Sequence, residues 1–440
     1  MLEKLNFKKN FVILSIPILS LLFWAFIAIL KDGFFIDPID FSAYYYAGRY
    51  IFTNPDAVYL VPHPSYFYYL PFIAVLFSPF SLIDIQTAAW LYYVVLLLFG
   101  IMSIIEFNRI LTLKMDLNPY YKLLSLFIIM GGYQLMVQFD LLNIKIIIMF
   151  LIIFFIRREY SQSKHEKYHK NPNWFQFWQI IILCSIIAMN PSLVFIIIIF
   201  LFYKVDYKDV IKKEQIKKYL IFLLIFTLQN FMFLIYPSLI SDFLNGFSHV
   251  KTVDSFDLFI SPSYVVEESI TFPISFLGSL NLIIQLDTTF LAILSVLIIT
   301  FITIYLSFFK DYAIDIKLAY FFLFSLFFNV FFKKTFILIL IPTLILLLYH
   351  FYNFNEDKTQ KTFSKNKILL AIGLAMLLIL NYLPPIEFLY RTITFFRILP
   401  VVVSLFVFTA LYSAYTIIIF FLNQKLTHEI KTPHNSLEKG

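Results

Sequence analysis

Long uncharged apolar runs, separated by short polar segments, recur along most of this chain and restrict its fold more than any other feature. The first extends from Phe11 to Leu30, and a helix of about 20 apolar residues crosses the hydrocarbon core of a bilayer. Because 61% of the residues are hydrophobic and the mean hydropathy is +0.84, no soluble globular domain of this length fits the composition. The sequence therefore predicts an all-α polytopic membrane protein.

Charge and cysteine content exclude several other functions. The net charge of +7 comes from basic residues in short loops beside apolar runs, which is typical of cytoplasmic loops rather than of a nucleic-acid-binding surface. The single cysteine, Cys184, lies inside an apolar run, where core packing is its expected role. The first run lacks a signal-peptide cleavage pattern, so we expect it to be retained as a span.

The distribution of charge predicts which loops lie on each side of the membrane. Four segments are rich in lysine or arginine and are expected inside; they are residues 1–10, 157–177, 204–218 and 351–367. In two long segments, 31–69 and 241–287, acidic residues outnumber basic ones, and these segments are expected outside. Both termini are then cytoplasmic, and 423–440 is an inside tail.

Applying this rule along the chain predicts about 12 crossings in one membrane domain, residues 1–440. The first outer loop, 31–85, would contain short interfacial helices and a re-entrant apolar piece, 70–83, broken by Pro79. The second outer loop is 241–287. The predicted crossings are 11–30, 86–105, 122–139, 141–156, two from a hairpin over 176–203, then 219–240, 288–309, 318–332, 335–350, 368–384 and 398–422.

The hairpin is expected because basic segments flank residues 176–203 on both ends, so one crossing would leave one of them outside. Asn190-Pro191 would divide it into two helices, since proline removes a backbone donor and restricts the preceding residue. Irregular backbone at membrane depth needs protein or a water-filled cavity around it, so this turn should face the protein interior.

The segment after the first span gathers carboxylates, tyrosines and an arginine. Asp37 precedes Pro38 in the pattern of a helix cap. Asp40 also fits the first turn of that helix, but Tyr44 shares its face and gives it polar, aromatic surroundings. A partly desolvated carboxylate there can act as a general base toward a hydroxyl group. Asp40 is the preferred base and Asp37 the alternative.

These residues carry a resemblance to a known family. Asp40-Phe41 with Tyr44, then Asn54-Pro55, Tyr69-Leu70-Pro71 and Pro79, resembles the amino-terminal signature of glycosyltransferase family 87, polytopic GT-C enzymes related to polyprenyl-phosphate-mannose-dependent α-1,2-mannosyltransferases. The resemblance is close over about 31–100 and topological beyond. It implies a GT-C-like bundle, a polyprenyl-phosphate sugar donor, a glycolipid or glycan acceptor, and Asp40 as the base that activates the acceptor hydroxyl.

Three departures from the family pattern lie later in the chain, and one of them is that no histidine is present around Lys333-Lys334-Thr335, where the family often has one. Where the family tends to carry Gly-Gln-x-Asn, this chain has Asp140-Leu141-Leu142-Asn143 and keeps the asparagine. Where the family tends to carry Lys-Pro, this chain has Asn190-Pro191. Gln138 and Asn143 are candidate sugar contacts, although a polar connection between two spans would look the same. Lys145 is either functional or a lysine reaching toward the headgroups.

Further candidates come from charge. Lys333 and Lys334 fall on the outer side of the predicted topology and could bind the phosphate of a lipid-linked donor. The alternatives are headgroup contact or a local inversion of the topology. Arg49 would bind the same phosphate or pair with Asp40 or Asp56. Tyr44, Tyr69 and His63 are the remaining candidate substrate contacts, with an ordinary loop role as the alternative for His63.

The sequence contains no metal-ligand spacing and no phosphate-binding glycine loop, so we expect neither a metal nor another cofactor. We therefore predict a membrane glycosyltransferase that moves a hexose, with mannose preferred, from a polyprenyl phosphate to an acceptor hydroxyl on the outer face, with inversion. A multi-pass transporter or lipid flippase is the alternative, for which the broken hairpin would form part of a pathway. A family member that binds glycolipid without turnover is a third.

Overall fold

The computed structural model describes most of the first 250 residues and three later helices. The described residues are 2–32, 39–60, 67–114, 119–165, 172–202, 205, 208, 210–248, 288–308, 314–328, 337–354 and 374. Every element assigned among them is a helix, which confirms the all-α class. The predicted crossings at 368–384 and 398–422 and the tail at 423–440 lie outside these residues, apart from Leu374. The count of about 12 crossings therefore stays a prediction.

The described chain consists of α-helices and two 3₁₀ turns, η1 and η2. In chain order they are α1 (Leu2–Asp32), α2 (Ile39–Tyr50), α3 (Ala57–Leu60), α4 (Pro71–Phe77), η1 (Phe80–Leu82), α5 (Ile85–Lys114), α6 (Pro119–Met130), α7 (Tyr133–Asp140), α8 (Lys145–His165), α9 (Pro172–Met189), η2 (Pro191–Leu193), α10 (Ile196–Leu201), α11 (Lys213–Gln229), α12 (Met232–Ile235), α13 (Ser238–Ser248), α17 (Thr288–Phe308), α18 (Ile314–Phe328) and α19 (Ile337–Phe354).

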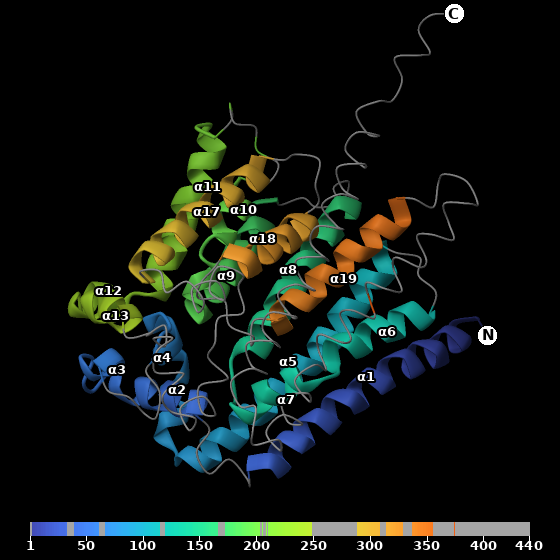
Figure 1. Ribbon diagram of the computed structural model, residues 1–440, viewed down its shortest axis with the longest axis horizontal. Coiled ribbons are helices and arrows are strands. Elements are labelled where there is room, and N and C mark those ends of the chain that lie inside the picture. The colour runs from blue at the N-terminus through green and yellow to red at the C-terminus, as the bar shows by residue number, and fades with distance from the viewer. Residues whose placement is uncertain are drawn as a thin grey trace, which may run out of the picture.

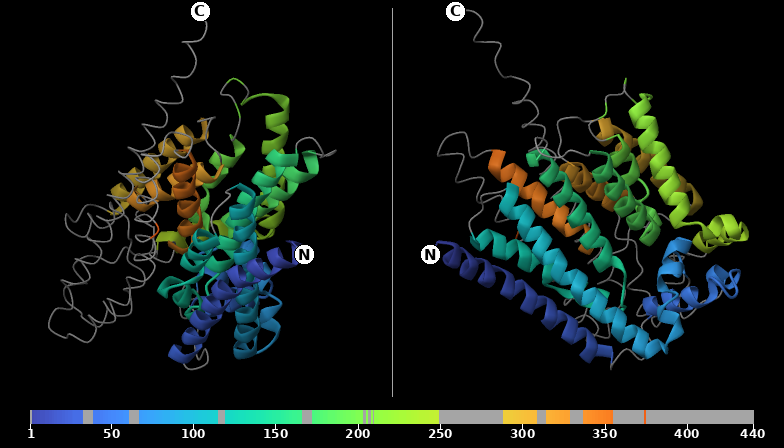
Figure 2. Two further views of the ribbon diagram at one scale, coloured as in Figure 1. Left: turned by 90° about the vertical axis from the view of Figure 1, so that its right-hand side faces the viewer. Right: turned by 180° about the vertical axis from the view of Figure 1, so that it is seen from behind.

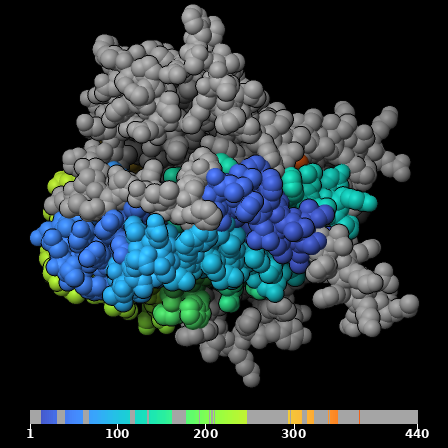
Figure 3. All heavy atoms as spheres, turned by 90° about the horizontal axis from the view of Figure 1, so that it is seen from below, coloured from blue at the N-terminus to red at the C-terminus, as the bar shows by residue number. Residues whose placement is uncertain are grey.

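Long helices lie side by side and carry the core. α5 packs against α1 and α8, and α8 in turn packs against α19, as the views in Figures 1 and 2 show. The short helices α2, α3 and α4 gather at one end of this row, beside α12 and α13. From below, the first part of the chain forms a continuous blue-to-cyan band (Figure 3).

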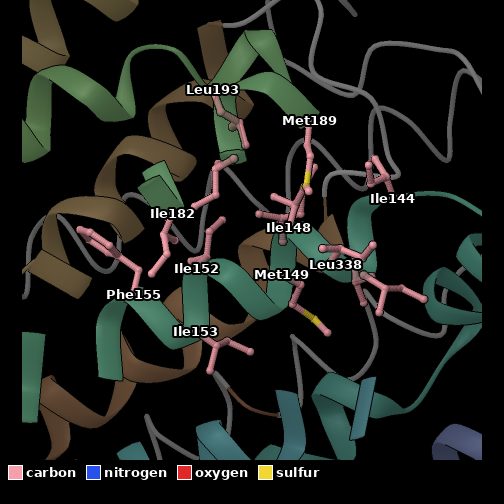
Figure 4. Packing of buried hydrophobic residues seen from close by; sticks show 14 of the residues in the cluster. Ile144, Ile148, Met149, Ile152, Ile153, Phe155, Ile182, Met189, Leu193 and Leu338 are labelled. Carbon is pink, nitrogen blue, oxygen red and sulfur yellow. The ribbon is translucent and has the colours of Figure 1, made fainter. Parts of the chain in front are cut away.

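Helix α8 lies at the centre of the core because its apolar side chains are buried on all sides. Ile148, Met149 and Ile152 are almost completely enclosed. Figure 4 shows their side chains among those of Met189, at the end of α9, and Leu338 of α19. A helix that is hydrophobic all round is stable only when protein or lipid surrounds it. Around α8 that surrounding is mostly protein.

Other helices have exposed apolar faces, and contact of these faces with water would be unfavourable. On α1, Leu19, Phe23 and Leu30 expose 63%, 56% and 60% of their surface. Similar exposed residues lie on α11 and α17, namely Leu220, Leu224, Leu228, Ile293, Leu297 and Phe301. Among the described residues, two helical segments, Ile13–Leu30 and Ile85–Leu113, are long and apolar enough to cross a membrane. Contact with lipid is the simplest explanation of these faces.

Two predicted crossings are not single helices. The segment 122–139 is divided between α6 and α7 at Gly131 and Gly132, and Gly132 has φ 114°, a conformation that glycine adopts without strain. The segment 219–240 is divided after α11, where the chain leaves the helix at Asn230 before the short helices α12 and α13. The length of the apolar runs predicts one helix for each crossing, whereas breaks in the backbone divide each run into shorter helices.

The breaks expected at prolines are confirmed. Helix α4 ends at Phe77 and η1 begins at Phe80, so the apolar piece at 70–83 is interrupted at Pro79 as predicted. Helix α9 ends at Met189, and η2 follows after Asn190, which is buried. Cys184 is buried in α9, as expected for a packing residue.

Candidate active site

Helix α2 fixes the position of Asp40. Asp40 lies in the first turn, where the helix dipole favours a carboxylate. The next residue, Phe41, is completely buried, and its ring stacks on Tyr92 of α5 with 5.4 Å between centroids. Near the other end, a Cβ added to Gly48 would come within 2.7 Å of the carbonyl carbon of Phe77. Close backbone contact with α4 and ring stacking on α5 therefore hold α2 in place.

The half-buried carboxylate of Asp40 is held by a neutral amide. Its Oδ2 accepts a hydrogen bond from Nδ2 of Asn143, a residue 103 positions later in the chain. Among the described residues, no lysine or arginine forms an ion pair with Asp40. No hydrogen bond to its Oδ1 is found within that part of the chain either. Among the described residues, one carboxylate oxygen is thus anchored and the other has no hydrogen-bond partner.

Asn143 is itself fixed by the backbone around it. Its Oδ1 accepts a hydrogen bond from the backbone N–H of Lys145, the first residue of α8, at 3.0 Å. Its own N–H donates to the carbonyl of Gln138 at 2.8 Å. Leu142 turns the chain with φ 49°, which is uncommon for leucine. Because an N–H occupies Oδ1, the amide must present its NH₂ group to Asp40.

Two of the predicted tyrosines meet beside Asp40. The rings of Tyr44 and Tyr69 contact edge to face at 5.0 Å, and their hydroxyls form a hydrogen bond of 2.9 Å. Burial raises the pKa of Tyr44 well above its ordinary value, and Tyr69 and Asp40 add to this effect. Burial, followed by the charge of Asp40, also raises the pKa of Tyr69. Both phenols are therefore neutral at physiological pH and can form hydrogen bonds as donors or acceptors.

Tyr92 is a site residue that the sequence analysis missed. It is 2% exposed, and its ring contacts those of Phe41, Tyr44 and Phe77. Its hydroxyl lies close enough to Asp40 to sense the carboxylate charge, yet it has no hydrogen-bond partner among the described residues. Within an apolar run, nothing in the sequence distinguishes this tyrosine from its many aromatic neighbours. Its role depends on the packing of α2 against α5.

Segments that are far apart in the sequence contact one another at this end of the molecule. The N–H of Leu70 donates to the carbonyl of Ala188, so the end of α9 and the turn at Asn190-Pro191 lie beside Tyr69 and Leu70. The hydroxyl of Tyr59 donates to the carbonyl of Tyr69 at 2.9 Å. The predicted first outer loop and the hairpin turn therefore meet in space.

The two acidic loops also meet. The hydroxyl of Ser238 donates to Oδ1 of Asp56 at 3.2 Å, and the rings of Tyr59 and Phe243 contact edge to face. Partial burial raises the pKa of Asp242, and the nearby charge of Asp56 raises it further. Helix α13 thus docks on α3, a helix of the same predicted outer loop that contains Asp40.

The remaining predicted residues have different outcomes. Arg49 is exposed at the end of α2, about 14 Å along the helix axis from Asp40. Among the described residues it forms no ion pair with Asp40 or Asp56. Gln138 is completely buried in α7, and within the described residues its side-chain amide has no hydrogen-bond partner. Four candidates lie outside the described residues, namely Asp37, His63, Lys333 and Lys334.

The arrangement has the parts of a general-base site. A carboxylate with one anchored and one available oxygen can remove a proton from a hydroxyl, and neighbouring phenols can orient a polyhydroxylated ligand. Among the described residues, no group of three histidine, cysteine or acidic side chains is placed to hold a metal ion. The chemistry that these residues offer is proton transfer and hydrogen bonding.

Comparison with known proteins adds the family. The sequence profile of glycosyltransferase family 87 matches residues 67–165, a segment that includes Tyr69, Tyr92, Gln138 and Asn143. The matched segment begins after Asp40, so the hydrogen bond from Asn143 connects Asp40 to it. Comparison with curated proteins and with solved structures found no match.

This family consists of glycosyltransferases, which act on a sugar donor and an acceptor. The apolar helices described above and the family match together point to a membrane location. The resemblance inferred from the sequence is thus confirmed over residues 67–165, which match the profile of glycosyltransferase family 87.

Proposed function

We propose that this protein is an integral membrane transferase that moves a hexose, with mannose as the preferred sugar, from a polyprenyl phosphate to a hydroxyl of a lipid-linked or polymer-linked glycan. The reaction takes place at the outer face, next to the end of the molecule where α2, α4 and α9 meet. One observation carries this proposal. Asn143 of the matched segment donates a hydrogen bond to Asp40, and no described residue forms a hydrogen bond with the other carboxylate oxygen, which we propose as the acceptor of the substrate proton.

The reaction is a single displacement. Asp40 removes the proton from the acceptor hydroxyl as its oxygen forms a bond to the anomeric carbon of the donor sugar. The bond between that carbon and the phosphate oxygen breaks, and the polyprenyl phosphate leaves with the electron pair. Attack from the face opposite the phosphate inverts the anomeric configuration. The proton on Asp40 is then released to solvent or to the departing phosphate.

The phosphate needs positive charge, and among the described residues no lysine or arginine forms an ion pair with Asp40. Lysine side chains bind phosphate as point charges, and Lys333 and Lys334 remain the proposed ligands. Arg49 is a weaker candidate for the phosphate next to the reacting carbon because it lies about 14 Å along α2 from Asp40. Tyr44, Tyr69, Gln138 and His63 are proposed to contact the sugars.

Sugar transfer in membrane fractions tests the proposal. The donor is radiolabelled polyprenyl-phosphate mannose, the acceptor is hexyl α-mannoside, and wild type is compared with Asp40→Asn at matched expression. Removing a general base typically lowers the rate about 10²- to 10⁴-fold. Asp84→Asn is the matched control, because Asp84 accepts a hydrogen bond from the N–H of Thr87 at the exposed start of α5, away from Asp40.

We expect Asp40→Asn to abolish most transfer and Asp84→Asn to retain it. Equal transfer by wild type and Asp40→Asn would remove Asp40 from the role of base. Absence of transfer by wild type with mannose, glucose and galactose donors alike would argue against a lipid-linked hexose as substrate.

A further inference from the structure

Tyr92 has a buried hydroxyl whose hydrogen-bonding capacity is unused. The side chain is 2% exposed, and no described residue forms a hydrogen bond with its oxygen. Most buried polar groups in folded proteins are paired, because an unpaired one loses its hydration without compensation. An unpaired hydroxyl beside a candidate catalytic carboxylate is therefore a candidate hydrogen-bond partner for a bound substrate.

Neighbouring tyrosines show that pairing is possible at this end of the molecule. The hydroxyls of Tyr44 and Tyr69 bond to each other at 2.9 Å, and that of Tyr59 donates to the carbonyl of Tyr69. The hydroxyl of Tyr45 donates to the carbonyl of Ile83 at 2.7 Å. These phenols have structural partners in the protein, whereas Tyr92 differs from them in having none among the described residues.

The ring of Tyr92 is held so firmly that its hydroxyl cannot easily find another partner. It stacks on Phe41 at 5.4 Å and meets Phe77 edge to face at 4.9 Å. Phe80 contacts a third side at 6.0 Å. Aromatic contacts of this kind favour particular ring orientations. The hydroxyl is therefore fixed at one place beside α2, the helix that carries Asp40.

Asp40 and Tyr92 together offer complementary groups to a sugar. The carboxylate accepts a hydrogen bond from the hydroxyl that will react, and the phenol can donate one to an adjacent ring hydroxyl. Sugar rings carry hydroxyls on neighbouring carbons, so one acceptor residue can satisfy both. Tyr44 and Tyr69 already bond to each other and would serve as the wall of this subsite.

We propose that Tyr92 is a substrate-binding residue of the acceptor subsite, where its hydroxyl donates a hydrogen bond to the ring hydroxyl next to the one that faces Asp40. This inference rests on the proposed transferase function and narrows the acceptor to a glycan with free hydroxyls on neighbouring carbons. The contact would give the hydroxyl a function at a position where other aromatic rings surround the side chain.

Tyr92→Phe tests the proposal because it keeps the ring and removes only the hydroxyl. Losing one hydrogen bond to the acceptor should raise the KM for hexyl α-mannoside about tenfold, with the KM for polyprenyl-phosphate mannose unchanged. The thermal midpoint of the detergent-solubilised protein should stay equal or rise, since an unpaired buried group is removed. Tyr45→Phe is the matched control: it removes a paired hydroxyl, so its midpoint should fall while the acceptor KM stays at the wild-type value.

Monodeoxy analogues of hexyl α-mannoside sharpen the test. One analogue, lacking the hydroxyl that Tyr92 contacts, should bind wild type about tenfold more weakly yet lose nothing further with Tyr92→Phe. An unchanged acceptor KM in Tyr92→Phe, or an equal further loss with every analogue, would overturn the assignment. If wild type transfers no sugar, thermal stabilisation by hexyl α-mannoside decides instead. A shift in wild type that Tyr92→Phe lacks supports the subsite, whereas equal or absent shifts refute it.

Discussion

Two carboxylates near the helix pair α5 and α8 have opposite surroundings. Asp40 packs against the start of this pair, where its partner is the neutral amide of Asn143. Glu106 lies about 21 Å further along α5 than Tyr92, and both of its oxygens meet guanidinium groups. Arg109 approaches one oxygen at 2.6 Å, and Arg157 of α8 approaches the other at 2.6 Å.

Under the proposed function, this difference separates a structural carboxylate from the one that acts as the base. Two arginines neutralise Glu106 and tie α5 to α8, so its charge is already used by the fold. An amide fixes the orientation of Asp40 without cancelling its charge, so that the carboxylate can still attract a proton. Both carboxylates are at least half-buried, so the identity of their partners, rather than burial, distinguishes them.

Exchanging each carboxylate for its amide should give the largest effects and opposite outcomes. Asp40→Asn should lower transfer about 10²- to 10⁴-fold with little change in thermal midpoint. Glu106→Gln should keep the transfer rate per folded protein and destabilise the fold by about 1–3 kcal/mol, because two arginines lose their counter-charge. Transfer assays and thermal unfolding in detergent measure both. If Glu106→Gln lost more transfer activity than its smaller amount of folded protein explains, Glu106 would not be a purely structural carboxylate.

Asn143→Ala tests whether the amide positions Asp40. Without the hydrogen bond from Nδ2, the carboxylate of Asp40 can rotate away from the acceptor hydroxyl. Misplacing the base in this way should lower kcat about 10- to 100-fold. The KM values for donor and acceptor should change less. Sugar transfer with both substrates varied separates these quantities.

Asn143→Ser is the control for the second contact of this side chain. A serine hydroxyl can still accept the N–H of Lys145, but it is too short to replace the amide that reaches Asp40. Asn143→Ala also loses the contact with the N–H of Lys145, so Asn143→Ser should be the more stable of the two variants and yet show the same drop in kcat. Wild-type kcat in Asn143→Ser would show that Asn143 merely caps α8.

Part of this site was predictable because its signals are local. Proline marks the breaks at Pro79 and Pro191, and the position of Asp40 in the first turn of a helix follows from the surrounding residues. The family resemblance is likewise a property of short motifs, and the profile match confirms it over residues 67–165. Long apolar runs suffice to predict the all-α class.

Other parts depend on contacts between distant segments. The hydrogen bond between Asn143 and Asp40 spans 103 residues, and no pattern near either residue predicts its partner. The position of Tyr92 was not predictable, because the length of an apolar run predicts a membrane span but does not show which face of α5 contacts α2. The break at Gly131 and Gly132 is not predictable from hydropathy for a related reason, since an apolar run can continue through a glycine pair or be interrupted by it.

Two glycines extend the comparison from charge to packing. At Gly48, an added Cβ would lie 2.7–2.8 Å from backbone atoms of Phe77 and Ser78, which cannot move without shifting α4. At Gly100, the nearest atoms are the ends of the Leu21 side chain at 3.0 Å, which can rotate. Gly48→Ala should therefore cost about 1–3 kcal/mol and reduce transfer several-fold by displacing α2, whereas Gly100→Ala should cost less. Thermal unfolding and transfer assays of the two variants check this order, and equal destabilisation would contradict it.

A third carboxylate, Asp242, faces another carboxylate and should show the smallest effect. Burial and Asp56 raise its pKa, so its stabilising contribution is complete below the unfolded value of about 3.9 and is lost as pH rises through the folded value. At neutral pH, the charged form therefore opposes the docking of α13 on α3. Asp242→Asn should raise the thermal midpoint at pH 7 by an amount worth less than about 1 kcal/mol, because solvent screens this partly exposed pair. The gain should vanish near pH 3; a gain that persists there would mean that repulsion from Asp56 is not its cause.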